Sequence, residues 1–147
     1  MGRLVVLVGL PGSGKSTWAG RQKEAALSSD EMRRLLADDP TDQTIHRRVF
    51  AAMRYLARVR HQIGRKVTNI DATNLTVQDR RPWIALAGLL DCEVEAIWFD
   101  TPPEICMARN RSRPRVVPED ALAEMMRKFS PPTLGEGFQR VITLRGF

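Results

Sequence analysis

Short runs of consecutive apolar residues alternate along this chain with longer stretches in which apolar residues recur every three or four positions. The runs have the length and composition of strands buried on both faces, and the longer stretches have the periodicity of helices. Strands are predicted over residues 4–8, 66–71, 93–99 and 139–144, with 25–29 as a short further candidate. Strands that alternate with helices predict an α/β fold, a parallel sheet of four to five strands flanked by helices on both faces.

Helices are predicted between these strands. They cover residues 16–24, 31–37, 41–63, 77–90, 104–110 and 119–129. In the longest of them, Val49, Met53 and Leu56 belong to an apolar stripe at helical spacing. Gly64 then suits the position just after a helix, and Thr76 suits the N-cap of the next one. No composition shift or linker divides the chain, so residues 1–147 are expected to form a single domain.

One loop in this pattern carries a specific chemistry. Residues 9–17 read Gly-Leu-Pro-Gly-Ser-Gly-Lys-Ser-Thr, which fits the P-loop pattern G-x-x-x-x-G-K-[ST]. The loop follows a predicted buried strand and opens a helix, as this motif requires. Its glycines let backbone N–H groups converge on one anion, and the helix N-terminus adds partial positive charge. We therefore expect a nucleoside triphosphate to bind here, in preference to a glycine turn that binds nothing.

The P-loop residues have distinct expected roles. Lys15 would neutralise the β- and γ-phosphates of ATP or another nucleoside triphosphate, and the Ser16 hydroxyl would hold Mg²⁺. The expected nucleotide-binding residues are Gly9, Pro11, Gly12, Ser13, Gly14, Lys15, Ser16 and Thr17.

Polar side chains follow other predicted strands. Ligands of open parallel sheets bind outside the carboxyl ends of the strands, where Asp30, Asp71 and Asp100 are expected to converge with the P-loop. Asp30 would lie beside the γ-phosphate as a general base, and its alternative role is to cap the following helix. Asp71 would bind Mg²⁺ directly or through water, and its alternative is a loop or cap residue. Arg33, one turn after Asp30, could bind a phosphate of the acceptor, or form a solvated surface pair with Arg34.

A cluster of four arginines occupies residues 109–115. Like charges repel, so such a cluster needs a reason to be held together. In a chain with a P-loop, positive charge that closes over transferring phosphates is that reason. We expect an arginine-rich lid over residues 109–118, and the alternative is an exposed basic loop.

The charge balance and the cysteines narrow the setting. The net charge of +6 favours polyanionic partners, although a merely soluble basic protein would share it. Cys92 and Cys106 have no metal-ligand spacing and fit buried thiols in a reducing compartment. No apolar run is long enough to cross a membrane, and the first strand leaves no room for a signal peptide, so a cytoplasmic location is expected. His46 and His61 have no metal partner and are expected to have no catalytic role, and no feature indicates an oligomeric state.

At these residues the chain resembles the kinase module of the polynucleotide 5′-hydroxyl kinases, a branch of the P-loop phosphotransferases. The resemblance rests on the P-loop followed by Trp18, on Ser29-Asp30-Glu31-Met32-Arg33, on Asp71-Ala72-Thr73-Asn74-Leu75 and on Arg109-Asn110-x-x-Arg113. It also includes Val116-Val117-Pro118 and Pro132-Thr133-x-x-Glu136-Gly137-Phe138. Many members of that family have a fused phosphatase or ligase domain, and none is expected within these 147 residues.

The resemblance implies a role for each matching residue. Asp30 would be the general base for the 5′-hydroxyl, and Arg33 would contact the 3′-phosphate of the acceptor. Arg109 and Arg113 would contact the donor phosphates from the lid. The expected acceptor contacts are Thr73, Asn74 and Val117, and residues 132–138 would lie near the adenine pocket.

Several functions remain open at this point. The preferred hypothesis is transfer of the γ-phosphate of ATP to the 5′-hydroxyl of a DNA or RNA end. One alternative is a small-molecule kinase on the same scaffold, of the gluconate, antibiotic or toxin type. Another is a nucleotide-binding switch or regulatory ATPase with no acceptor. A general nucleic-acid-binding module is disfavoured because no aromatic platform or recognition motif is evident.

Overall fold

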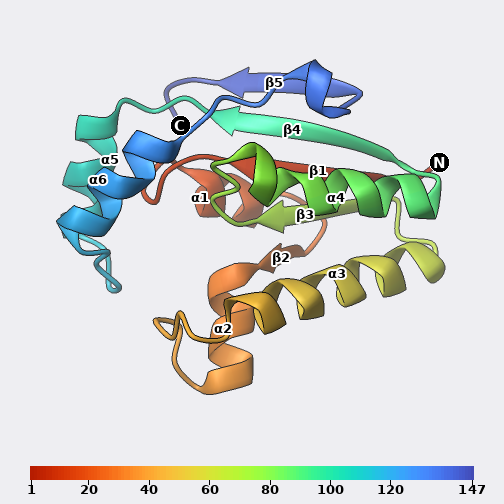
Figure 1. Cartoon of the computed structure of the whole chain (residues 1–147), viewed down its shortest axis with the longest axis horizontal. Coiled ribbons are helices and arrows are strands. Elements are labelled where there is room, and N and C mark those ends of the chain that lie inside the picture. Colours follow the sequence, from red (N-terminus) through yellow and green to blue (C-terminus); the bar gives the residue numbers. More distant parts are fainter.

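A five-stranded parallel sheet forms the centre of the molecule, as the computed structural model of residues 1–147 shows (Figure 1). The strand order is β2-β3-β1-β4-β5, and every neighbouring pair is parallel. The strands are β1 (Arg3–Val8), β2 (Ala26–Ser28), β3 (Val67–Asp71), β4 (Glu93–Phe99) and β5 (Arg140–Leu144). The predicted sheet is confirmed, including the short candidate strand, which becomes an edge.

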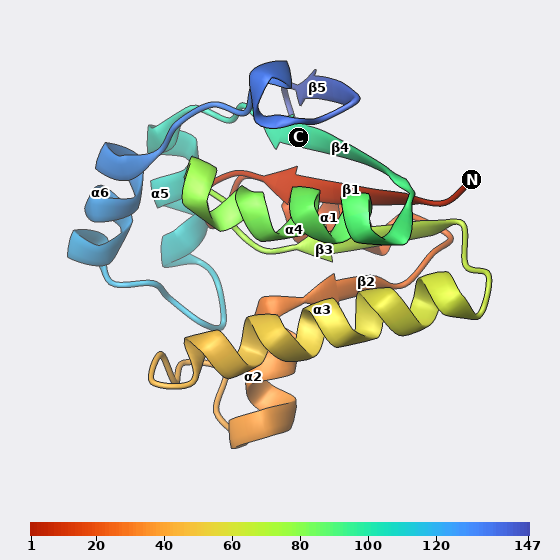
Figure 2. The ribbon, with the colours of Figure 1, turned by 45° about the vertical axis from the view of Figure 1, so that its right-hand side comes forward.

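Six α-helices connect the strands. They are α1 (Lys15–Gly20), α2 (Ser29–Ala37), α3 (His46–Gln62), α4 (Val77–Leu90), α5 (Pro103–Arg111) and α6 (Glu119–Lys128), followed by a 3₁₀ turn, η1 (Leu134–Glu136). Helices α3 and α4 cover one face of the sheet and α1 covers the other, so the predicted layers are confirmed (Figure 2). None of the helices is both long and apolar enough to span a membrane.

The central strand β1 is buried on both faces, which explains its unbroken run of apolar residues. Leu4, Val6 and Val8 point into a core shared with α3 and α4. Val5 and Leu7 point the other way and pack with residues of α1 and β4. A strand with this double burial anchors the P-loop that follows it at residue 9.

Two helices are shorter than predicted. Helix α1 ends at Gly20, a residue of low helix propensity, where 16–24 was predicted. Helix α3 begins at His46, where 41–63 was predicted. The side chains of Asp39 and Asp42 accept hydrogen bonds from the backbone N–H groups of Thr41 and Thr44. These local turns compete with the helix and delay its start.

A buried ion pair joins α4 to the segment before β5. The fully buried Arg80 guanidinium donates two hydrogen bonds to Glu136, at 2.8 and 3.1 Å, and a third to the Asn74 carbonyl at 2.9 Å. Burial alone would raise the pKa of Glu136, but the hydrogen bonds from Arg80 and Thr133 hold the pKa below its usual value. The pair therefore ties three segments together around one charge.

Replacing Glu136 with Ala leaves the buried Arg80 charge without its partner. We expect the free energy of unfolding to fall by about 3–5 kcal/mol, measured by urea denaturation. The matched control is Glu119→Ala, which removes an exposed ion pair with Arg111 and should cost about 0–1 kcal/mol. Equal effects of the two substitutions would contradict the structural role of the Arg80–Glu136 pair.

Candidate active site

A cavity of about 970 Å³ opens at the carboxyl ends of the strands. It is lined by the P-loop, by the start of α2, by the first half of α3, by the β3–α4 loop and by the arginine segment after α5. The volume is at the upper end of the range for small-molecule sites, about 300–1,000 Å³. The cavity therefore has room for a nucleotide and part of a second substrate.

The P-loop backbone depends on two glycines. Gly12 and Gly14 have φ values of +84° and +108°, a left-handed region that other residues rarely adopt. A Cβ atom on Gly12 would also lie 2.8 Å from the Cys106 carbonyl oxygen of α5. The motif is thus held in a fixed shape by its own backbone and by the helix beside it.

Lys15 lies folded over this loop. Its ammonium donates hydrogen bonds to the carbonyls of Gly9, at 2.7 Å, and Leu10, at 3.0 Å. Burial lowers the pKa of Lys15 to about 8, although the nearby Asp71 carboxylate acts in the opposite direction. Arg113 adds to the lowering, because it brings a second positive charge toward the same point. An anion bound between Lys15 and Arg113 would offset the effects of burial and of Arg113 on the pKa of Lys15.

The structure brings Ser16 and Asp71 together as predicted. The Ser16 hydroxyl donates a hydrogen bond of 2.9 Å to the Asp71 carboxylate. A hydroxyl and a carboxylate are oxygen ligands of the kind that Mg²⁺ prefers. No group of three or more His, Cys, Asp or Glu side chains could hold a metal by itself. The pair therefore fits a Mg²⁺ ion that takes its remaining ligands from phosphates and water.

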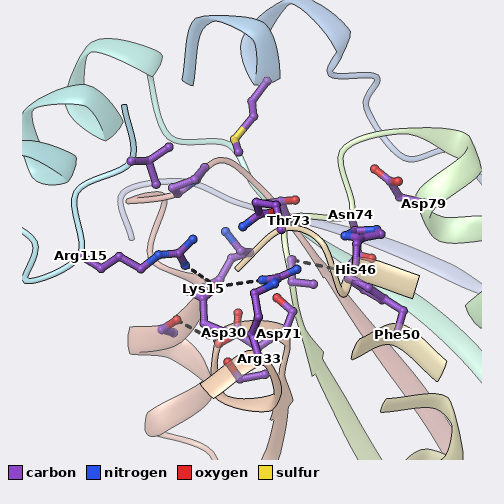
Figure 3. A pocket seen from close by; sticks show the side chains of 18 of the residues that line it. Lys15, Asp30, Arg33, His46, Phe50, Asp71, Thr73, Asn74, Asp79 and Arg115 are labelled. Atoms are coloured by element: carbon purple, nitrogen blue, oxygen red, sulfur yellow. Dashed lines mark hydrogen bonds and ion pairs between the residues drawn. The ribbon is translucent and has the colours of Figure 1, made fainter. Parts of the chain in front are cut away.

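Asp30 lies at the start of α2, and its carboxylate points into the cavity between two arginines (Figure 3). Arg115 approaches one carboxylate oxygen at 2.6 Å, and Arg33 approaches the same oxygen at 3.5 Å. The cap of α2 is Ser28, whose hydroxyl accepts a hydrogen bond from the backbone N–H of Glu31. The alternative role of Asp30 as the N-cap is therefore wrong.

The two arginines of α2 differ in their surroundings. Arg33 is only 5% exposed, and its Nε has no hydrogen-bond partner. Arg34 is exposed and pairs with Glu31. A solvated surface position was the alternative expected for both Arg33 and Arg34. Only Arg34 has such a position. A buried guanidinium with a free donor at a cavity wall is suited to bind an anion.

The arginine segment begins inside a helix, because α5 continues to Arg111. Arg109 donates a hydrogen bond of 3.2 Å to the Gly12 carbonyl, and Arg113 lines the cavity with a buried Nη1 that has no partner. The fully buried Asn110 side chain bonds both the N–H and the carbonyl of Val117, at 2.9 and 2.7 Å. This double contact joins the two residues that flank the loop of residues 111–116, so Asn110 holds the ends of that loop together.

The expected acceptor residues also meet in the cavity. Thr73, Asn74 and Val117 all line it. The Asn74 amide donates to the carbonyls of Leu7 and Ala72, at 2.8 and 3.3 Å, which ties the β3–α4 loop to β1. Its buried Oδ1 has no partner.

One expectation about this end of the sheet is wrong. Asp100 does not line the cavity, and instead pairs with Arg145 at 3.2 Å. Residues 132–138 do not line the cavity, since Glu136 is paired with Arg80 and Phe138 lies in the main core, and their place near the adenine stays a prediction.

Several cavity residues were missed by sequence reasoning. The sequence does not distinguish Arg115 from the other arginines of residues 109–115, and it indicates no role for His46. The α3 residues that line the cavity are His46, Arg47, Arg48, Phe50, Ala51 and Arg54. The apolar stripe of this helix showed which face is buried but not which end borders the site. The available signal was that residues 46–62 contain no Asp or Glu.

Known proteins resemble this chain in sequence and in fold. The bifunctional polynucleotide phosphatase/kinase of Schizosaccharomyces pombe is 29% identical over 143 residues, and the match covers 94% of this chain but only 32% of the relative. The chain thus spans about a third of that protein's length. The resemblance seen in the sequence is confirmed by this match.

Solved structures share the fold at lower identity. A chain of the Pnkp1/Rnl/Hen1 RNA repair complex matches 86% of this chain and 43% of its own length, with a TM-score of 0.72 and 22% identity. The APS kinase CysC of Mycobacterium tuberculosis, solved with AMPPNP and APS, matches 97% of this chain and 88% of its own length, with a TM-score of 0.67 and 18% identity. Residues 4–132 also match the model of a family described as an AAA domain. The chain therefore belongs to this AAA-domain family and has the fold of P-loop kinases.

Proposed function

We propose that this protein transfers the γ-phosphate of ATP to the 5′-hydroxyl of a DNA or RNA end. The observation that supports it most is the carboxylate of Asp30, which shares one cavity with the P-loop and lies between Arg33 and Arg115. A switch ATPase would have no use for a carboxylate and a buried arginine on the acceptor side of the triphosphate.

On the donor side, the P-loop N–H groups and Lys15 bind the β- and γ-phosphates. The ammonium of Lys15 exchanges the carbonyls of Gly9 and Leu10 for phosphate oxygens. Ser16 and Asp71 would hold Mg²⁺, which would neutralise charge on the phosphates. Arg109 and Arg113 bring positive charge from the lid to the transferring group.

On the acceptor side, Asp30 accepts the proton of the 5′-hydroxyl as its oxygen attacks the γ-phosphorus. A bond forms between that oxygen and phosphorus, the bond to the β–γ bridging oxygen breaks, and ADP leaves. Arg33 binds the 3′-phosphate of the terminal nucleotide, with Thr73, Asn74 and Val117 around the rest of it. Arg115 and Arg33 both approach Oδ1 of this carboxylate, so Oδ2 is the oxygen that is available to the hydroxyl.

A small-molecule kinase is the second candidate, because the APS kinase of Mycobacterium tuberculosis shares the fold of this chain, with a TM-score of 0.67. The two candidates differ in how transfer responds to salt. Binding of a polynucleotide weakens steeply as salt rises, because each phosphate contact releases counterions. A small acceptor shows little of this dependence.

Replacing Asp30 with Asn keeps the shape of the side chain and removes the proton acceptor. We expect kcat for transfer to fall by about 10²–10⁴-fold while ATP still binds. Transfer is measured with γ-labelled ATP, and ATP binding by calorimetry. Glu31→Gln is the matched control, since Glu31 is an exposed neighbour whose partner is Arg34. Asp30→Asn with the activity of the unaltered protein would reject the proposed base.

The affinity for ATP should depend on pH through Lys15. Phosphates bind the protonated ammonium, and the pKa of Lys15 in the free protein is about 8. Affinity should therefore fall as pH rises above that value, by up to about tenfold per pH unit. Calorimetry between pH 7.5 and 9.5 should also detect proton uptake on binding. Lys15→Met should bind ATP weakly and lose this pH dependence. A constant affinity over the range would contradict the role of Lys15.

A further inference from the structure

Helix α3 has a charge distribution that the reaction described above does not explain. Its 17 residues include five arginines and no carboxylate. Arg60 is occupied by hydrogen bonds to Thr68 and Val67, but Arg47, Arg48, Arg54 and Arg58 form no ion pair. Two of these four lie in the first turn, where the helix dipole already contributes positive charge. The like charges repel one another, and an anion bound there would relieve the repulsion.

The end of α3 that carries this charge borders the cavity. The helix begins beside the carboxyl ends of the strands and runs away from them (Figure 2). Arg47 and Arg54 both line the cavity, and Arg58 continues the same helical face at i+4 from Arg54. The opposite face of α3, with Val49, Met53 and Ala57, is buried against the sheet. The arginines therefore form a row that leads out of the site.

Two aromatic side chains of α3 lie at the inner end of this row. His46 and Phe50 are neighbours, with ring centroids 4.7 Å apart, and both line the cavity near Asn74 (Figure 3). Partial burial and the charge of Arg33 lower the pKa of His46, which favours the neutral imidazole. Flat faces beside a row of cations are the combination that binds single-stranded nucleic acid, through base stacking and phosphate contacts.

We infer that this face of α3 is a second acceptor subsite, which binds the nucleotides that follow the 5′-terminal one. Arg47 and Arg54 bind their phosphates, and the His46–Phe50 pair contacts a base. Along the helix axis these two arginines are about 10 Å apart, the length of about three stacked nucleotides at roughly 3.4 Å each. The inference rests on the proposed function, and it adds that the acceptor is a strand of several nucleotides.

The test compares acceptors of different length at several salt concentrations. The acceptors are a nucleoside 3′-phosphate and single-stranded 5′-hydroxyl oligonucleotides of two, four and eight nucleotides. For the unaltered protein, KM should fall as the acceptor lengthens. With Arg47→Ala/Arg54→Ala, KM for the octanucleotide should rise roughly tenfold at 0.1 M salt. The slope of log KM against log salt should decrease by about 1.4, because two phosphate contacts are lost at about 0.7 each.

The matched control is Arg65→Ala/Lys66→Ala. These two exposed cations follow α3 at the far end of the molecule and form no ion pair, so the control removes the same charge outside the cavity. The ratio of KM for the nucleoside 3′-phosphate to KM for the octanucleotide should fall about tenfold in the α3 variant. In the control this ratio should stay at the value of the unaltered protein.

The possible results distinguish failure of the α3 subsite from failure of 5′-phosphorylation. If KM does not depend on acceptor length, or if both double variants change the ratio equally, the subsite is overturned while 5′-phosphorylation stands. If no 5′-hydroxyl acceptor is phosphorylated, the proposed function fails and the subsite fails with it. The length dependence of the unaltered protein needs no variant, so a folding defect in the α3 variant would not rescue the inference.

Discussion

An excess of positive charge is the constraint around which this site is organised, because the cations of the cavity outnumber its carboxylates. Nine Lys and Arg side chains line the cavity, and only three Asp side chains do. Each of these three carboxylates already has a partner. Asp71 accepts from Ser16, Asp30 lies beside Arg33 and Arg115, and Asp79 accepts from the backbone N–H of Thr76. The unpartnered atoms of Arg33 and Arg113 follow from the same excess. Burial lowers the pKa of Lys15, and the charge of Arg113 adds to the lowering. Phosphates would supply the missing negative charge.

The fold keeps these cations close together by fixing their backbones. The P-loop is set between the buried strand β1 and helix α5, and the β3–α4 loop is tied to β1 by Asn74. Asn110 closes the base of the arginine loop through Val117. Behind the site, the Arg80–Glu136 pair joins α4 to the segment before β5 and also contacts the Asn74 carbonyl. Repulsion among the arginines of the cavity is therefore resisted by hydrogen bonds that other side chains form.

Local patterns predicted most of the fold and the donor half of the site. Buried strands and the P-loop have strong local signals, and Thr76 was predicted as the N-cap that the structure confirms with a capping box. What sequence reasoning missed depends on tertiary placement. No local signal shows that α3 begins at the cavity, that Arg115 reaches Asp30, or that Asp100 turns away to Arg145. The absence of acidic residues from α3 was visible in the sequence, but its meaning depends on where the helix lies.

Phosphorylation of a 5′-hydroxyl end can be measured directly as transfer of label from γ-labelled ATP in the presence of Mg²⁺. The acceptors are a 5′-hydroxyl oligonucleotide and the same oligonucleotide with a 5′-phosphate, each at low and high salt. We expect label on the 5′-hydroxyl strand alone, with transfer that weakens as salt rises. Release of labelled phosphate to water without any labelled strand would contradict this expectation.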